Sequence, residues 1–266
     1  MTTGNDLELA ADLIRKGKLV AFPTETVYGL GADAGNRDAL SLLYAAKGRP
    51  SNHPVIVHLS HVEQVSDWAQ NIPPEVETLA GAFWPGPLTL ILKRKHGVLD
   101  EVTGGQDTVA LRIPAHPLAL KLLKLVGIGV AAPSANKFGR LSPTRAIDVE
   151  EEFGAELSYV VDGGPSQVGI ESTIVDLSGR QKKILRPGQI SRDKLAGFIK
   201  LCEPGKIDLD TPRTPGSLES HYAPSCPVIL SRQEKLSSLI EKLELNNESF
   251  AVLSFNTPAK TNNAPW

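Results

Sequence analysis

The stretch LVAFPTETVYGLG, residues 19–31, shows in miniature how this chain is organised. Its first four residues, Leu19 to Phe22, have the length and composition of a short buried β-strand. The loop that follows places two hydroxyls, a carboxylate and a phenol beside Gly29 and Gly31, which let a ligand approach the backbone. Similar polar loops follow other short apolar runs, so we predict a ligand site built from loops at strand ends.

Helical and strand patterns alternate outward from this stretch to about residue 200. Apolar residues at helical spacing predict helices at 6–17, 39–46 and 115–126. Short apolar runs predict strands at 55–59, 88–92, 109–113, 130–132, 160–161 and 172–177. The mixture predicts an α/β (α+β) domain over residues 1–202 and leaves the strand order open.

The composition changes after residue 202. Residues 203–227 are rich in proline and have little periodicity, which predicts a semi-rigid linker. Beyond it, the pattern predicts a strand at 228–230, a helix at 235–245 and a second strand at 250–255. This order is the opening of a βαβ unit, so we expect an incomplete second domain at 228–266.

The overall charge and the cysteines exclude several classes of protein. The net charge is −2, so binding to phosphate or RNA must come from a local cluster of Lys and Arg. Cys202 and Cys226 predict two reduced thiols and no disulfide framework. Residues 1–18 lack the apolar run of a signal peptide, and no segment has the roughly 20 apolar residues of a membrane span. We therefore expect a cytoplasmic protein with no membrane partner.

Positive charge is concentrated in the polar loops, among hydroxyls and Gly/Pro turns, at Lys47, Arg49, Arg112, Lys137, Arg140 and Arg186. Arg112 lies inside a predicted strand, where a cation is costly unless it meets an anion. The set suits a triphosphate and a carboxylate in one cleft. Two structural alternatives stay open: Lys47 could complement a helix dipole, and Ser142 before Pro143 could be a helix N-cap.

Other chemistries lack their sequence patterns. The chain contains no G-x-x-x-x-G-K-[ST] phosphate loop and no G-x-S-x-G nucleophile. Its six histidines form no H-E-x-x-H, and its cysteines form no C-x-x-C. We therefore predict no metal site made by protein ligands alone.

The motifs resemble those of the YrdC-like family of threonylcarbamoyl-AMP synthases, in the family's order. They are PTETVYGLG (23–31), KGRP (47–50), PVIVHL (54–59), WPGPLTLIL (84–92), TVALRIPAHP (108–117), PSAN (133–136), GIESTIVDL (169–177), RPG (186–188) and the linker motif HYAP (221–224). The resemblance implies a twisted mixed sheet with flanking helices, a linker, and the start of a small Rossmann-like domain.

The resemblance also implies a reaction. Threonine and bicarbonate form a carbamate that attacks the α-phosphate of ATP, pyrophosphate leaves, and threonylcarbamoyl-AMP passes to the proteins that modify tRNA. Mg²⁺ would accompany ATP. Lys47 and Arg49 would be the catalytic cations. Threonine would be held by Thr26, His58, Arg112, Ala132 and Ser172. ATP would be held by Arg49, His53, Thr108, Ser134, Asn136, Ser142, Arg186 and, closing over it from the linker, Tyr222.

Two features depart from the family pattern, and two other functions compete. His53 stands where the family more often has Asn, and the linker lacks the basic residues often found before HYAP. The first alternative is a non-catalytic module that binds double-stranded RNA through a basic face. The second is the YrdC-like part of a hydrogenase-maturation carbamoyltransferase, which we expect to carry acylphosphatase and zinc-finger modules; neither is recognisable in residues 1–266.

Overall fold

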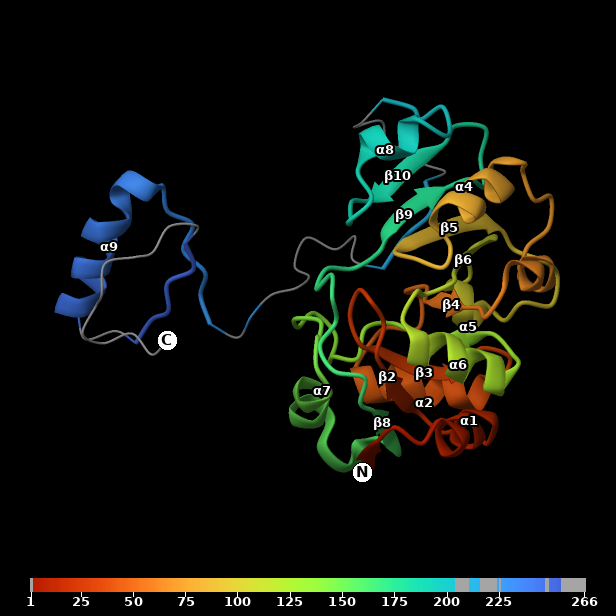
Figure 1. The fold of residues 1–266 in the computed structure, drawn as a ribbon, viewed down its shortest axis with the longest axis horizontal. Coiled ribbons are helices and arrows are strands. Elements are labelled where there is room, and N and C mark those ends of the chain that lie inside the picture. The colour runs from red at the N-terminus through yellow and green to blue at the C-terminus, as the bar shows by residue number, and fades with distance from the viewer. Residues whose placement is uncertain (1, 204–210, 216–223, 225, 247–248, 255–266) are drawn as a thin grey trace. The chain divides into compact units, whose positions relative to one another are not determined.

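A computed structural model describes residues 2–203, 211–215, 224, 226–246 and 249–254 (Figure 1). Strands and helices alternate along it as expected. Their order is β1 (Thr2–Gly4), α1 (Leu7–Arg15), β2 (Val20–Phe22), β3 (Gly29–Asp33), α2 (Arg37–Lys47), β4 (Ile56–His58), η1 (Val62–Gln64), α3 (Val65–Trp68), α4 (Glu75–Phe83), β5 (Leu88–Lys93), α5 (Asp100–Thr103), β6 (Thr108–Arg112), α6 (Pro117–Val126), β7 (Val130–Ala131), α7 (Ala146–Phe153), η2 (Gly154–Glu156), β8 (Tyr159–Val161), β9 (Thr173–Asp176), β10 (Lys183–Arg186), α8 (Arg192–Ala196) and α9 (Gln233–Leu245).

Within the described residues the strands form one ten-stranded sheet in the order β1-β8-β2-β3-β7-β4-β6-β5-β9-β10. The sheet is mixed: β4 and β6 are parallel, whereas β5 and β6, and also β4 and β7, are antiparallel. Pairing places strands far apart in sequence side by side, so the predicted α/β class with a mixed sheet is confirmed.

Helices cover both faces of the sheet and bury separate apolar clusters. On one face, α1 and α6 pack together over β2, β7 and β8, with Ile14 and Leu122 fully buried (Figure 1). On the other face lies the larger cluster, to which α2 contributes Leu40 and Leu43. Burial of these apolar side chains from water is the main favourable contribution to folding.

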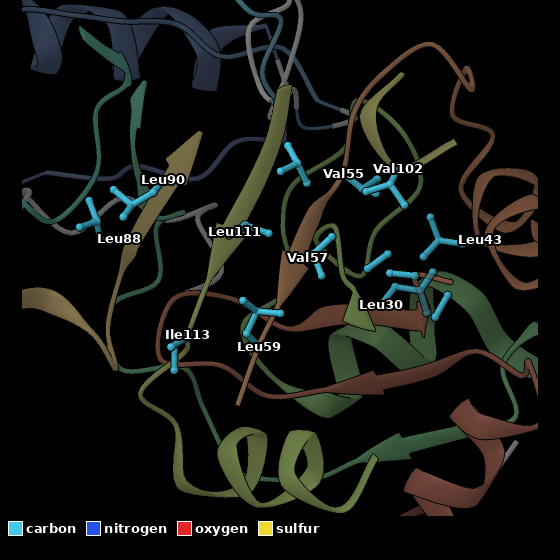
Figure 2. Close-up of a cluster of buried hydrophobic side chains, with 14 of the residues drawn as sticks. Leu30, Leu43, Val55, Val57, Leu59, Leu88, Leu90, Val102, Leu111 and Ile113 are labelled. Carbon is cyan, nitrogen blue, oxygen red and sulfur yellow. The ribbon is translucent and has the colours of Figure 1, made fainter. Parts of the chain in front are cut away.

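The alternation of side chains along β4 and β6 decides what each face contains. Val57 and Leu111 point into the larger cluster, together with Leu59 and Ile113 just beyond the strands (Figure 2). Their neighbours point to the opposite face, because successive side chains of a strand alternate. The register pairs His58 with Arg112, so these two polar side chains lie next to each other on that opposite face.

Helix α2 has clear signals at both ends. Asn36 caps the first turn, since its side-chain oxygen accepts hydrogen bonds from the backbone N–H groups of Asp38 (3.0 Å) and Ala39 (3.2 Å). Gly48 ends the helix in the left-handed conformation, with φ of 60°. Lys47 is therefore the last helical residue, and the turn at Gly48 directs Arg49 away from the helix.

The predicted elements of residues 1–200 recur within a few residues, whereas the short strands β1, β3 and β10 and the helices α3, α4, α5, α7 and α8 were not predicted. The end of the predicted loop at 23–31 is part of a strand, since β3 begins at Gly29. The alternative role of Ser142 as an N-cap is wrong, because α7 starts at Ala146 with Arg145 as its N-cap. Asp148, in the first turn of α7, accepts the backbone N–H of the N-cap residue Arg145 (3.0 Å), so this helix start is stabilised without Ser142.

The chain divides into two compact units, Met1–Ala223 and Pro224–Trp266. In the second unit the predicted helix is present as α9, but the predicted strands are wrong: residues 228–230 and 250–254 have no strand structure. Val228 is 74% exposed and Leu230 is 99% exposed, and no described segment pairs with them. A strand needs a partner for its ladder of hydrogen bonds, so the apolar run alone does not make one. The Rossmann-like organisation of this unit stays a prediction.

Among the described residues no helix is both long and apolar enough to cross a membrane.

We predict that Leu111→Ala destabilises the first unit by about 2–5 kcal/mol, because Leu111 is fully buried and its truncation leaves a cavity. The matched control is Leu42→Ala on α2, where the side chain is 49% exposed and the expected cost is below about 1 kcal/mol. Urea unfolding followed by circular dichroism measures both. Equal free energies of unfolding for the two variants would contradict this account of the core.

Candidate functional site

A pocket lined mainly by polar residues lies on the face of the sheet that carries His58 and Arg112; about 490 Å³ within it, open solvent included, is not filled by protein atoms. Its walls come from strand ends and from the loops that follow them, as the sequence pattern predicted. The lining consists of Thr24, Thr26, Val27, Gly29, Arg49, Ile56, His58, Arg112, Ala132, Pro133, Ser134, Glu171, Ser172, Arg186 and Pro215.

Arg112 is buried at the end of β6 and is held by three hydrogen bonds. Its Nε donates to the carbonyl of Gly86 (3.2 Å), Nη1 to Thr26 Oγ1 (2.9 Å) and Nη2 to Glu25 Oε1 (2.7 Å). The Arg112 and Glu25 side chains are 5% and 8% exposed, so they form a buried ion pair. Glu25 also accepts the backbone N–H of Ala115 through Oε2 (3.0 Å). This fixed carboxylate compensates the charge of Arg112 and orients its guanidinium.

The loop at residues 23–28, which lies between β2 and β3, is tied to a distant segment of the chain. The backbone N–H of Val168 donates to the Glu25 carbonyl (2.8 Å), and that of Gly169 donates to the Thr26 carbonyl (3.0 Å). Inside the loop, the hydroxyls of Thr24 and Thr26 lie 2.8 Å apart. The loop is therefore a rigid part of the cavity wall, since its backbone bonds are satisfied by the protein.

His58 is a neutral imidazole in this site. Burial, with the positive charge of Arg112 as a second cause, lowers the pKa of His58 to about 3. Its Nδ1 lies 3.4 Å from the carbonyl of Ile56. A neutral ring beside Arg112 can donate or accept one hydrogen bond without adding charge to the cavity.

Lys47 lies behind the cavity wall, fully buried. Its Nζ donates to the carbonyls of Ser134 (2.5 Å) and Asn136. Burial, followed by the nearby charge of Arg49, lowers the pKa of Lys47 to about 7, and the negative charge of Glu171 acts in the opposite direction. Since the ordinary pKa of a lysine is about 10.4, this amine can change its charge near neutral pH.

Arg49 follows Lys47 across the Gly48 turn and lines the cavity. Its Nη2 donates to the carbonyl of Pro54 (2.8 Å), and its guanidinium carbon lies 5.5 Å from the centre of the Phe138 ring. The ring and the carbonyl fix the direction of the guanidinium.

Arg186, at the end of β10, connects residues predicted for threonine with residues predicted for ATP. Nε donates to the carbonyl of Ser172 (3.0 Å), and Nη2 donates to its hydroxyl (3.0 Å). Nη1 donates to Glu171 Oε2 (2.5 Å) and to the carbonyl of Pro215 (3.1 Å). Part of the predicted linker therefore reaches the cavity, and Arg213 in the same segment donates to the carbonyl of Gly104 (2.8 Å).

The structure brings many of the predicted site residues to this one cavity. Those that line it are Thr26, Arg49, His58, Arg112, Ala132, Ser134, Ser172 and Arg186. Ser142 does not line the cavity itself, but its hydroxyl donates to the lining residue Glu171 (2.9 Å). Their roles stay predictions.

Three further predicted residues, Asn136, His53 and Thr108, do not line the cavity, and a fourth is outside the described residues. Asn136 is buried behind the wall; its Nδ2 donates to the carbonyls of Lys137 and Arg140, and its Oδ1 has no protein partner among the described residues. His53 packs edge-on against Phe138. Thr108 is at the opposite end of β6 from Arg112. Tyr222 is outside the described residues, as is His221.

The predicted site lacks Glu25, Glu171 and Pro215, although each of them lines the cavity or binds a residue that does. The missed signal was charge balance: several cations in buried loops require anions in contact with them. Each glutamate is in one of the quoted polar loops, and each pairs with an arginine.

Comparisons with known proteins agree with the architecture and the motifs. A family model named for Sua5, YciO and YrdC, described as telomere recombination, matches residues 12–188. A second model, the C-terminal domain of threonylcarbamoyl-AMP synthase, matches residues 188–265.

Relatives match over most of the chain. The threonylcarbamoyl-AMP synthase of Pyrococcus abyssi is 44% identical over 258 residues, which cover 93% of this chain and 76% of the relative. That of Bacillus subtilis is 40% identical over 276 residues, which cover 100% of this chain and 78% of the relative. The crystal structure of Pyrococcus abyssi Sua5 complexed with L-threonine superposes with a TM-score of 0.91 at 40% identity, covering 99% of this chain and 83% of that one. The chain therefore is an enzyme of the Sua5/YrdC family, the threonylcarbamoyl-AMP synthases.

Proposed function

We propose that this enzyme forms L-threonylcarbamoyl-AMP and pyrophosphate from L-threonine, bicarbonate and ATP. The observation that carries the proposal is the single cavity shared by residues predicted for threonine, such as Arg112, and residues predicted for ATP, such as Arg186. The direct hydrogen bonds from Arg186 to Ser172 join the two sets. A reaction between two bound substrates needs this proximity.

Arg112 is suited to a substrate carboxylate. Its bonds to Gly86, Thr26 and Glu25 use three of the five N–H groups of a guanidinium, so among the described residues two remain for a ligand. In our proposal the carboxylate of threonine accepts from these two groups. The neutral His58 and the hydroxyl of Ser172 complete the polar surroundings of the amino acid.

The cations of the cavity are suited to the phosphoryl-transfer step. A carbamate oxygen of N-carboxy-threonine attacks the α-phosphorus of ATP, the bond to the bridging oxygen breaks, and pyrophosphate leaves with that electron pair. Arg49 and Arg186 stabilise the charge that develops on the phosphate oxygens, while Lys47 holds the loop that carries Ser134.

Mg²⁺ belongs to the proposed substrate rather than to a protein cage. Among the described residues no group of three or more His, Cys, Asp or Glu could hold a metal ion, and Glu25 and Glu171 are paired with arginines. The residues present fit an ion bound to the phosphates of ATP and to water, which neutralises phosphate charge.

The product is a mixed anhydride and is prone to hydrolysis, so we propose that it passes from this enzyme to the cytoplasmic proteins that transfer the threonylcarbamoyl group to tRNA. The linker, residues 203–227, would act as a lid that excludes water, with Tyr222 over the nucleotide. The contact between Arg186 and Pro215 supports a linker that reaches the site.

The alternative of an RNA-binding module has less support. It requires cations on an exposed face, where phosphates of a duplex can reach them. Lys47, Arg49, Arg112 and Arg186 are instead buried, each less than 9% exposed.

The first prediction for the activity is that pyrophosphate release requires ATP, threonine and bicarbonate together. The carbamate is the attacking group, so omission of either of its precursors should reduce release to background. A coupled pyrophosphate assay with each component omitted in turn measures this. Undiminished release without threonine would contradict the proposed substrate.

The second prediction concerns the Arg112–Glu25 pair. The double variant Arg112→Met with Glu25→Gln removes both buried charges, so it avoids the cost of an unpaired Glu25 that Arg112→Ala alone would incur. We expect threonine affinity to fall by about 2–4 kcal/mol, because charged hydrogen bonds to the carboxylate are lost. ATP affinity should change less.

Calorimetric titration of threonine and of ATP measures both effects, and Arg145→Ala is the control because Arg145 pairs with Asp148 outside the cavity. A folded double variant with unaltered threonine affinity would remove Arg112 from the substrate site.

The third prediction concerns Lys47. Lys47→Met should lower turnover by roughly 100-fold or more, because the amine that holds the Ser134 loop in position is lost and the reacting groups are misplaced. Its free energy of unfolding at pH 7 should change by less than about 2 kcal/mol, since removing a buried amine offsets the loss of its hydrogen bonds.

The pH dependence checks the same residue. The folded state lowers the pKa of Lys47 to about 7, so it binds fewer protons than the unfolded state between about pH 7 and pH 10. Lys47 therefore makes stability rise with pH in that window, and Lys47→Met should remove the rise. A variant with full turnover and reduced stability would instead support the helix-dipole role.

A further inference from the structure

Glu171 holds an unusual position in the cavity, because its carboxylate bonds two residues that are predicted to bind ATP. Oε2 accepts from Arg186 Nη1 at 2.5 Å, and Oε1 accepts from the hydroxyl of Ser142 at 2.9 Å. Arg186 and Glu171 are 8% and 15% exposed, so the pair is mostly shielded from water. Two oxygens of a phosphate would use the same two donors.

The remaining bonds of Arg186 show which group faces the ligand space. Nε and Nη2 are bound to the carbonyl and hydroxyl of Ser172, and the Ser172 hydroxyl lies 2.7 Å from that of Thr89. Nη1 also donates to the carbonyl of Pro215 (3.1 Å). The guanidinium therefore has a support that does not depend on Glu171. Its Nη1, the nitrogen bound to Glu171, is the one that can exchange one anion for another without movement of the arginine.

The backbone beside Glu171 is closely packed, which favours an exchange made by its side chain. A Cβ on Gly188 would lie 2.7 Å from the Glu171 carbonyl oxygen and 2.5 Å from the Thr173 backbone nitrogen, which shows how closely the two segments pack. On the other side, Thr173 is paired with Leu88 in the sheet. The carboxylate can therefore leave Arg186 by a change of the Glu171 side-chain rotamer.

We propose that Glu171 is an affinity-determining placeholder: in the empty cavity its carboxylate occupies the place of an ATP phosphate, and the phosphates displace it from Arg186 and Ser142 on binding. The inference rests on the proposed ATP site and adds a residue that competes with the nucleotide. It explains how the charge of Arg186 is compensated, and its guanidinium oriented, before the substrate binds.

The exchange has a consequence for specificity. Displacing Glu171 adds binding free energy only for a ligand whose negative charge at this point exceeds that of one carboxylate. Polyphosphates therefore gain more binding free energy than a monophosphate, and adenosine gains none. After pyrophosphate leaves, the carboxylate can return to Arg186 and weaken the binding of the remaining product, threonylcarbamoyl-AMP. Glu171 thus favours ATP on entry and release of the products.

The test is calorimetric titration of the full chain with inorganic pyrophosphate, ATP and adenosine, for wild type and Glu171→Gln, each with and without Mg²⁺. Gln has the same size and still accepts one hydrogen bond, but it lacks the charge that competes with phosphate. We expect Kd for pyrophosphate and ATP to fall roughly 5- to 10-fold and Kd for adenosine to stay the same. In turnover, KM for ATP and kcat should both fall, because release slows.

The matched control is Glu156→Gln, which removes the same charge from a pair with Lys137 outside the cavity and should leave all three affinities unchanged. Thermal unfolding checks that the variants fold, and Glu171→Ala is the second variant if Gln disturbs the loop. It should also bind pyrophosphate more tightly.

Unchanged or weaker binding of ATP and pyrophosphate to a folded Glu171→Gln would overturn the inference; weakening seen only with Mg²⁺ would make Glu171 a ligand of the nucleotide-bound metal instead. If wild type binds and turns over ATP while Glu171→Gln binds ATP and pyrophosphate no more tightly, the inference is wrong and the proposed function still stands. If wild type binds neither ATP nor pyrophosphate, the proposed function fails with it.

Discussion

Side chains of a strand alternate between its two faces, and in β4 and β6 this alternation separates the apolar core from the chemistry. Val57 and Leu111 hold the sheet against the larger cluster, while the neighbouring His58 and Arg112 face the cavity in register. A shift of register by one residue would bury the cation in the core and expose the leucine. The packing that stabilises the sheet therefore also fixes the position of the site.

Charge compensation is the second requirement of this site. A guanidinium in a shielded cavity is costly unless an anion contacts it, and both Arg112 and Arg186 meet this condition through a glutamate. The two pairs differ in their surroundings. Glu25 is also bound by the backbone of Ala115 and stays in place, whereas Glu171 shares its second oxygen with the Ser142 hydroxyl. The first pair has a backbone anchor at its carboxylate, and in our proposal the second is the one that a phosphate opens.

The local parts of this architecture were predictable from the sequence, because they depend on near neighbours. Short apolar runs, a glycine after Lys47 and an arginine within a strand gave the strands, the end of α2 and the cationic site. The strand order and the partners of the cations depend on contacts between distant segments: Glu25 and Arg112 are 87 residues apart. The apolar runs at 228–230 and 250–254 show the limit of such patterns, since strands need partners that periodicity does not reveal.

A crystal structure of the chain with L-threonine and a non-hydrolysable ATP analogue tests the central claim most directly, that one cavity holds both substrates on compensated arginines. The account predicts the threonine carboxylate on Arg112, with Glu25 still bound to it, and phosphate oxygens on Arg49 and Arg186, with the Glu171 carboxylate turned away. A nucleotide bound outside the cavity, or a threonine carboxylate out of hydrogen-bonding reach of Arg112, would contradict it.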